Sequence, residues 1–458
     1  MGCRKVFLTC SSRRKGIQHP PRRERSTSFA EWGEDRRIRH TTKPFDWWLT
    51  GICVSRAFNG LVFMTYAAVL PVLQREWAMT GAQAGLVSSG FQMGYAVSLV
   101  VFSSLADRLG PKPLFLGSMS AAAFFALGFA FLARDYPSAL VIYTLVAISL
   151  GGTYTTGLML LAQQYSPQKR GRAIGYFIAS TSLGYALSLV LSGAALPIGG
   201  YRLSFLITCS GPAAGALLVW ITLRNTPTAI ERRSVTKGFA RTVLTDRPAL
   251  LIIGGYIFHS WELLAMWAWT PAFLTACLVT TGTDRMQAAG MGAYITASFH
   301  VLGMLASLSM GALSDRMGRA RVILALAAVS TACSFGFGWS IAWPLSATVA
   351  IGLVYAFTAL GDSPVLSAAL TEVVPAAFMG AAFGLRSLLG FAAGALSPLL
   401  FGVVLDWSNP AGIAPGGYAH WGWAFAVLGL GGLGAVWCAH RFGRLQGQPA
   451  AQKGSLEG

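Results

Sequence analysis

The chain has 458 residues, of which 54% are hydrophobic and 11% are charged, and its mean hydropathy is +0.55. These values are typical of membrane proteins and argue against a soluble globular domain, in which about a quarter of the residues are charged. The net charge of +18 would also suit a nucleic-acid-binding protein, so the positions of the basic residues have to decide between the two classes.

The first segment, Met1–Asp46, is polar and basic and lacks the apolar core of a secretory signal. We expect it to be a disordered cytoplasmic arm, which could contact anionic lipid headgroups. A start codon assigned too far upstream is the alternative interpretation.

Twelve apolar stretches of about 20 residues follow the arm, and each is long enough to cross roughly 30 Å of hydrocarbon as a helix. They predict an all-α membrane protein with twelve spans. The stretches are Trp47–Val72, Ala84–Leu105, Pro113–Ala133, Ser138–Ala162, Ala173–Ala195, Leu203–Leu223, Ala249–Ala276, Ala288–Gly311, Val322–Ala342, Leu345–Glu372, Phe378–Leu405 and Trp421–His440.

Basic residues gather on one predicted side of the membrane, because the arm, the tail and alternate connections hold most of the 35 lysines and arginines. The opposite connections hold only Arg75, Arg134, Arg202 and Arg285. This asymmetry is the positive-inside pattern, which predicts that both chain ends are cytoplasmic. It accounts for most of the net charge, so nucleic-acid binding is not needed to explain the basic composition.

A short polar motif occurs twice between apolar stretches, as SLADRLG at Ser104–Gly110 and as ALSDRMG at Ala312–Gly318. The repeat predicts two copies of one six-helix bundle that share their orientation. The predicted parts after the arm are a first bundle at 47–223, a basic cytoplasmic linker at 224–248, a second bundle at 249–442 and a cytoplasmic tail at 443–458.

Both copies of the motif resemble the cytoplasmic signature of the major facilitator superfamily of secondary transporters, G-x-L-x-D-R-x-G-R-x-R/K. The segment Gly311–Arg321 fits this signature in full, whereas the first copy departs from it at Ser103, Pro111 and Pro113. Together with the spans and the six-plus-six repeat, the resemblance covers nearly the whole chain after the arm. It implies two pseudo-symmetric six-helix bundles around a central cavity.

In that family the motif acts as a latch between the two halves in the outward-facing state, and the resemblance implies the same role here. Gly110 and Gly318 would allow the sharp chain reversal, and the aspartates would hold arginines or face the N-terminus of a neighbouring helix. The simpler interpretation is that these charges only fix the topology. The latch residues are Asp107, Arg108, Gly110, Gly311, Asp315, Arg316, Gly318 and Arg319.

Several ionisable or polar side chains lie inside the predicted spans, where a charge costs about 3 kcal/mol unless it faces a wet cavity or a partner. Glu262 would serve as a proton-coupling carboxylate or as a partner of Arg56 or Arg386. A structural ion pair or snorkelling is the alternative for Arg56 and Asp362. The predicted substrate and ion pathway comprises Arg56, Asn59, Gln92, His259, Glu262, His300, Asp362 and Arg386.

Two arginines in the pathway favour an anionic substrate, because guanidinium pairs with carboxylate in a bidentate way, although the two carboxylates could cancel that preference. Ser138–Ala162 lacks the arginine that the family's fourth helix often carries for proton coupling. The fifth stretch lacks the G-P-x-x-G-G run of many drug/proton antiporters, so drug efflux is less favoured.

The sequence thus predicts secondary active transport of a small solute by alternating access, with an organic anion coupled to protons or another ion as the leading interpretation. The alternatives are a proton-driven exporter of amphipathic compounds and a transporter-like receptor or assembly factor. No nucleotide-binding, nucleophile–base or metal-ligand motif occurs, so we expect neither an enzyme nor a cofactor or metal. We expect a monomer in the cell membrane whose partners are lipid and a small-molecule substrate, without nucleic acid.

Overall fold

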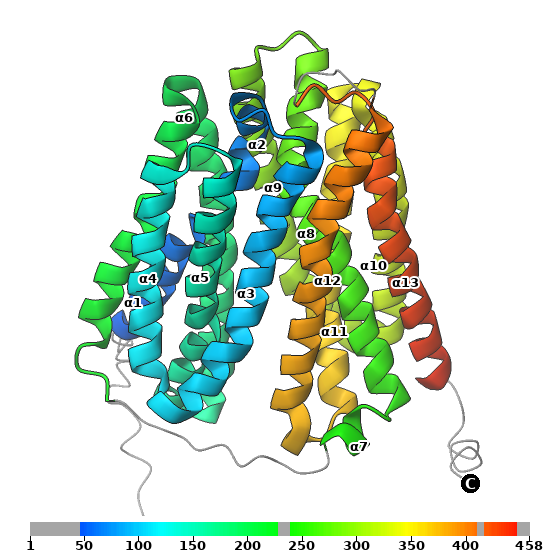
Figure 1. Cartoon of the computed structure of the whole chain (residues 1–458). Coiled ribbons are helices and arrows are strands. Elements are labelled where there is room, and N and C mark those ends of the chain that lie inside the picture. The colour runs from blue at the N-terminus through cyan, green and yellow to red at the C-terminus, as the bar shows by residue number, and fades with distance from the viewer. Residues whose placement is uncertain (1–45, 228–238, 410–415, 447–458) are drawn as a thin grey trace, which may run out of the picture. The chain divides into compact units, whose positions relative to one another are not determined.

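The computed structural model describes residues 46–227, 239–409 and 416–446, so the predicted arm lies outside the described residues except for its last position. Every regular element in these ranges is helical (Figure 1). The α-helices are α1 (Trp47–Gly60), α2 (Thr65–Glu76), α3 (Gly81–Leu109), α4 (Pro111–Leu132), α5 (Tyr136–Gln164), α6 (Pro167–Leu223), α7 (Phe239–Val243), α8 (Arg247–Thr280), α9 (Arg285–Met317), α10 (Arg319–Phe337), α11 (Leu345–Val373), α12 (Met379–Ser408) and α13 (Gly422–Gln446). Two short 3-10 helices, Gly338–Ala342 and Ala376–Phe378, precede α11 and α12.

Eleven helical segments in the described ranges are long and apolar enough to cross a membrane. The first combines α1 and α2, which a turn at 61–64 separates. The backbone of α6 is non-helical at Gly199 and Gly200, so its 57 residues form two successive helical segments. The predicted stretches Ala173–Ala195 and Leu203–Leu223 lie on these two segments. The predicted all-α membrane fold is confirmed, whereas the count of twelve crossings and the cytoplasmic location of the chain ends stay predictions.

Two glycines make the sharp reversals that the motif predicts. Gly110 separates α3 from α4 with a φ of 84°, and Gly318 separates α9 from α10 with a φ of 91°. Side chains with a Cβ are strained at such angles, so glycine is the residue that fits. Both reversals lie at the same end of the helices, which we call the motif end, and the other is the opposite end (Figure 1).

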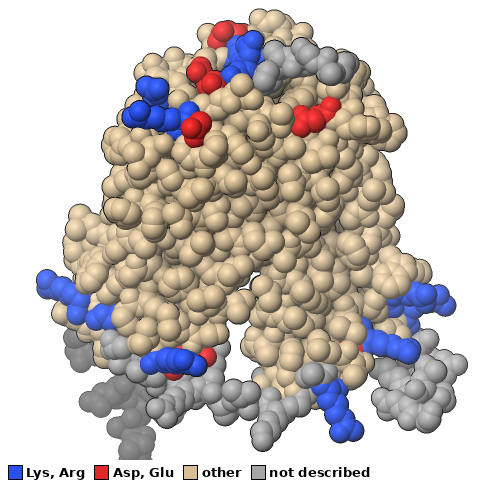
Figure 2. Space-filling view, in the orientation of Figure 1, with Lys and Arg blue, Asp and Glu red and all other residues tan. Residues whose placement is uncertain are grey.

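The helices pack as two bundles, α1–α6 and α8–α13, which meet where α3 packs against α12 and α6 against α9. Figure 2 shows a notch between the bundles at the motif end, and the surface closes above it toward the opposite end. The charged side chains in that view gather at the two ends, and a broad band of other residues lies between them. Such a band is the surface that a lipid bilayer requires.

Asp406 near the end of α12 joins the two bundles at the opposite end. Its carboxylate accepts hydrogen bonds from the backbone N–H groups of Gly81 (2.7 Å) and Ala82 (2.8 Å), the first residues of α3, and from the Tyr418 hydroxyl (2.7 Å). A helix N-terminus has unpaired N–H groups and a partial positive charge, which a carboxylate complements. The backbones approach so closely that a Cβ at Gly81 or Gly402 would collide with the other residue's carbonyl oxygen.

Candidate functional site

Arg56 lies on α1 with only 5% of its surface exposed. Its Nε donates to Thr181 Oγ1 at 2.9 Å, and its Nη1 donates to Thr153 Oγ1 at 2.6 Å. The rings of Tyr154 and Phe177 lie 5.5 and 5.4 Å from its Cζ, within the range of cation–π attraction. Hydroxyls and rings hold the guanidinium in place, but they do not neutralise its charge.

Arg386 on α12 has similar surroundings in the second bundle, with 7% of its surface exposed. Its Cζ lies 4.0 Å from the ring of Tyr256 and 4.6 Å from that of Phe383. Its Nη1 donates to Ser367 Oγ at 2.8 Å, and its buried Nε has no hydrogen-bond partner among the described residues. This guanidinium is therefore partly free to bind another group.

Neither arginine forms an ion pair with a carboxylate of the described residues. The structural ion pair that the sequence left open for Arg56 is thus absent among the described residues, whereas Asp362 contacts His259. Tyr154 of the first bundle lies within electrostatic range of both Arg56 and Arg386, so the two guanidinium groups border one region between the bundles. Two desolvated cations without a counter-ion make that region suited to an anion.

His259 and Asp362 form a close contact between α8 and α11. The distance from His259 Nδ1 to Asp362 Oδ1 is 2.7 Å, and the two side chains are 4% and 8% exposed. Tyr256 lies one helical turn before His259, and the two rings are 5.4 Å apart. Because Tyr256 also stacks on Arg386, the pair is connected by direct packing to the cation of the second bundle.

Glu262 lies one turn beyond His259 but points into the second bundle, where its carboxylate accepts hydrogen bonds from two serines of α10. The donors are Ser330 Oγ at 2.9 Å and Ser334 Oγ at 2.5 Å, and Ser334 Oγ also lies 2.5 Å from the Tyr355 hydroxyl of α11. The arginine partner that the sequence offered as one alternative for Glu262 is therefore absent from the described structure.

Two small cavities lie beside Trp267, with volumes of about 20 and 10 Å³, so each has room for about one water molecule. Gln92 lines the larger one and His300 the smaller one, so the structure brings these two predicted pathway residues to neighbouring spaces. Asn59 lies instead beside Arg56, where its Nδ2 is 3.5 Å from Thr153 Oγ1. The side-chain atoms Asn59 Oδ1, Gln92 Oε1 and His300 Nε2 are buried without hydrogen-bond partners in the described part of the chain.

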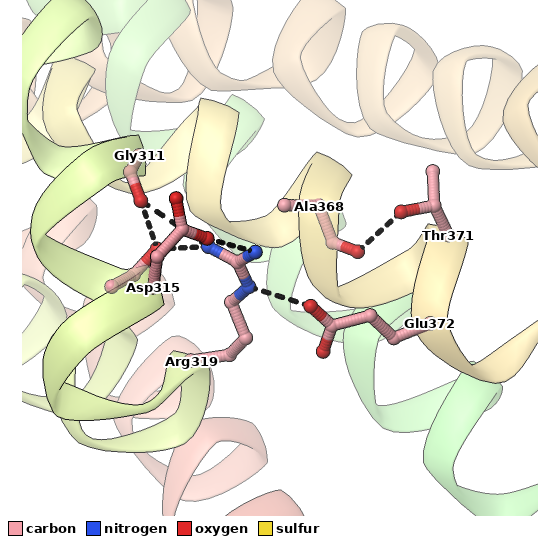
Figure 3. Close-up of polar contacts among 7 residues, drawn as sticks. Gly311, Asp315, Arg319, Ala368, Thr371 and Glu372 are labelled. Carbon is pink, nitrogen blue, oxygen red and sulfur yellow. Dashed lines mark hydrogen bonds and ion pairs between the residues drawn. The ribbon is translucent and has the colours of Figure 1, made fainter.

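The second copy of the latch motif makes its contacts within one bundle (Figure 3). Arg319 forms ion pairs with Asp315 and, at 2.9 Å, with Glu372 of α11, and it donates to the Gly311 carbonyl at 3.2 Å. In the first copy, Asp107 and Arg108 lie at the end of α3, and their side chains have no hydrogen bond or ion pair among the described residues. The structure is open at the motif end, and a contact between the halves through these residues stays a prediction.

Sequence reasoning missed several residues that shape this region. Tyr256 was missed although it stands one turn from His259, a spacing that places both on one helical face. Asp406 was missed because it follows the predicted stretch Phe378–Leu405 directly and so looked like a residue of the connection. Nothing in the sequence separates Thr153 or Ser367 from the many other hydroxyl residues of the spans.

The sequence model described as the Major Facilitator Superfamily matches residues 52–398. The chain therefore belongs to this superfamily, whose members are transporters and not enzymes. The predicted family is confirmed, and with it a multi-pass membrane protein that transports a small solute.

Named relatives are distant but extend over most of the chain. A protein of Cupriavidus pinatubonensis named "Probable 4-methylmuconolactone transporter" is 23% identical over 82% of this chain and 87% of its own length. The gallate transporter of Pseudomonas putida is 24% identical over 67% of this chain and 73% of its own length. A crystal structure of a bacterial homologue of the human lysosomal transporter Spinster superposes with a TM-score of 0.72 at 15% identity, covering 86% of this chain and 96% of that one.

Proposed function

We propose that this member of the Major Facilitator Superfamily carries a small organic anion through the region between Arg56 and Arg386. The observation that carries the proposal is the pair of buried guanidinium groups, one in each bundle, that have no carboxylate partner among the described residues. A carboxylate between them would receive charge-assisted hydrogen bonds from both halves. Binding would then draw the bundles together around the anion, as alternating access requires.

Two relatives support the proposed substrate class. Both 4-methylmuconolactone and gallate, the solutes in their names, are organic anions. The aromatic rings of Tyr154, Phe177, Tyr256 and Phe383 around the two guanidinium groups also suit a planar carboxylate, because they exclude water and stack on flat groups.

We also propose that protons drive the transport, with the His259–Asp362 pair and Glu262 as the candidate carriers. Asp362 and His259 pack toward Arg386 through Tyr256, so an anion that attracts Arg386 would change the surroundings of the pair. Glu262 lies within electrostatic range of both residues of the pair. We further place the motif end, the linker and both chain ends in the cytoplasm, so the described conformation would be inward-open in the cell membrane.

Uptake of labelled gallate and benzoate into proteoliposomes tests the proposal. We expect Arg56→Ala and Arg386→Ala each to lower uptake at least 10-fold, since each removes charge-assisted hydrogen bonds to the anion. Arg134→Ala is the control, because this exposed arginine lies outside the bundle interface. Uptake that stays the same in both interior variants would overturn the proposed anion site, and uptake indifferent to an imposed pH gradient would overturn the proton coupling.

A further inference from the structure

A group of unpaired polar atoms lies deeper between the bundles than the two arginines. Gln92 Oε1, Trp267 Nε1, Thr270 Oγ1 and His300 Nε2 are all buried, and none has a hydrogen-bond partner among the described residues. Their side chains line the two cavities beside Trp267. Buried polar groups are almost always paired, so these four unpaired groups, which line two neighbouring cavities, can each still bind a polar partner.

These four residues, which we call the upper subsite, lie between the arginines and the closed opposite end. Trp267 is about three helical turns further along α8 than Tyr256, on which Arg386 stacks. Tyr185 connects the two levels, because it is within electrostatic range of Arg56 while its ring lies 5.8 Å from that of Trp267 and 6.3 Å from that of His300. A solute that enters from the motif end therefore reaches the arginines first.

The rest of the cavity lining carries no charge, and apart from the hydroxyl side chains Tyr66, Ser88, Tyr143 and Thr296 it is apolar. Phe63, Phe91 and Leu264 line the larger cavity, and Phe299 and Leu360 line the smaller one. No lysine, arginine, aspartate or glutamate is part of either lining. A second carboxylate would be desolvated here without a cation, whereas a hydroxyl or amide could both donate to Gln92 and accept from the Trp267 N–H.

We propose that the upper subsite binds the neutral hydrogen-bonding end of the transported anion and so selects hydroxylated or otherwise polar-substituted ring carboxylates over unsubstituted ones. This inference rests on the proposed anion site and adds its specificity. The selection follows from the cost of leaving buried polar groups unpaired when the analogue lacks the hydroxyl.

Binding of 4-hydroxybenzoate and benzoate to the purified full-length protein tests the inference. The two probes share the ring and carboxylate and differ only in the hydroxyl. We expect the wild type to bind 4-hydroxybenzoate about 10-fold more tightly, which corresponds to one buried hydrogen bond. The double variant Gln92→Leu/His300→Phe should bind both probes within about 2-fold of each other, and its elution as a single species in size-exclusion chromatography is the check on folding.

The two threonines of the smaller cavity supply a matched control. Thr270 has an unpaired hydroxyl, whereas the Thr296 hydroxyl already donates to the Gly292 carbonyl at 2.7 Å. Thr270→Val should weaken the preference for 4-hydroxybenzoate, and Thr296→Val should leave it unchanged.

The possible outcomes separate this inference from the proposed function. If Arg56→Ala abolishes binding of both probes while the upper-subsite variants keep the wild-type preference, the subsite is wrong and the anion site stands. If the wild type shows no preference, the subsite is also wrong. If the wild type binds neither probe, or if Arg56→Ala and Arg386→Ala bind both as the wild type does, the anion site fails and the subsite fails with it.

Discussion

The contact of Asp406 with the N-terminus of α3 should control how readily the opposite end opens. Asp406→Ala removes two charge-assisted hydrogen bonds, to Gly81 N–H and Ala82 N–H, that cross between the bundles. Hydrogen bonds to charged groups contribute about 1.5 kcal/mol or more each, so the closed arrangement of this end should lose about 3 kcal/mol of stability relative to the open one. That loss corresponds to a roughly 100-fold decrease in the ratio of molecules closed at the opposite end to molecules open there.

Hydrogen–deuterium exchange read by mass spectrometry measures this effect directly, because Gly81 N–H and Ala82 N–H have the Asp406 carboxylate as their acceptor. We expect exchange at the start of α3 to accelerate up to roughly 100-fold in Asp406→Ala. Asp406→Asn, which retains one carbonyl acceptor, should give an intermediate rate. Exchange at the wild-type rate in both variants would refute the reasoning that this carboxylate holds the end closed.

Three further predictions concern other contacts. Gly402→Ala should also accelerate exchange at the start of α3, because its Cβ would collide with the Gly81 carbonyl, whereas Gly384→Ala on the same helix has open space and should not. His259→Ala should lower the free energy of unfolding by about 3 kcal/mol, because it leaves the buried Asp362 unpaired. Adding Asp362→Asn should recover part of that loss, as measured by thermal unfolding. If the double variant instead lost the sum of the two single-variant losses, the two residues would not form a direct pair. The hydroxyl and backbone N–H of Ser138 hold the pKa of Asp135 below its ordinary value of 3.8, so this cap stabilises the start of α5 above that pH and loses its effect as the pH falls through the lowered pKa. Exchange of the Ser138 N–H, corrected for its intrinsic rate, should therefore rise at the lowest pH in the wild type but not in Asp135→Asn.

The sequence by itself determined the class and the family of this protein. Long apolar stretches have no stable alternative to membrane helices, because lipid cannot satisfy backbone hydrogen bonds. The repeated Asp-Arg-x-Gly turn predicted the reversals at Gly110 and Gly318, since only a residue without a Cβ adopts those angles easily. The rarity of charge at membrane depth identified Arg56 and Arg386 without any knowledge of their surroundings.

Only the tertiary structure decided which of these polar residues meet. Periodicity places His259 and Glu262 on one face of α8, but it does not predict that His259 contacts Asp362 while Glu262 turns to the serines of α10. The contact of Asp406 with Gly81 joins residues from opposite halves of the chain, and no local pattern encodes such a pairing. Contacts of this kind depend on how the bundles pack, which the identity and spacing of neighbouring residues do not specify.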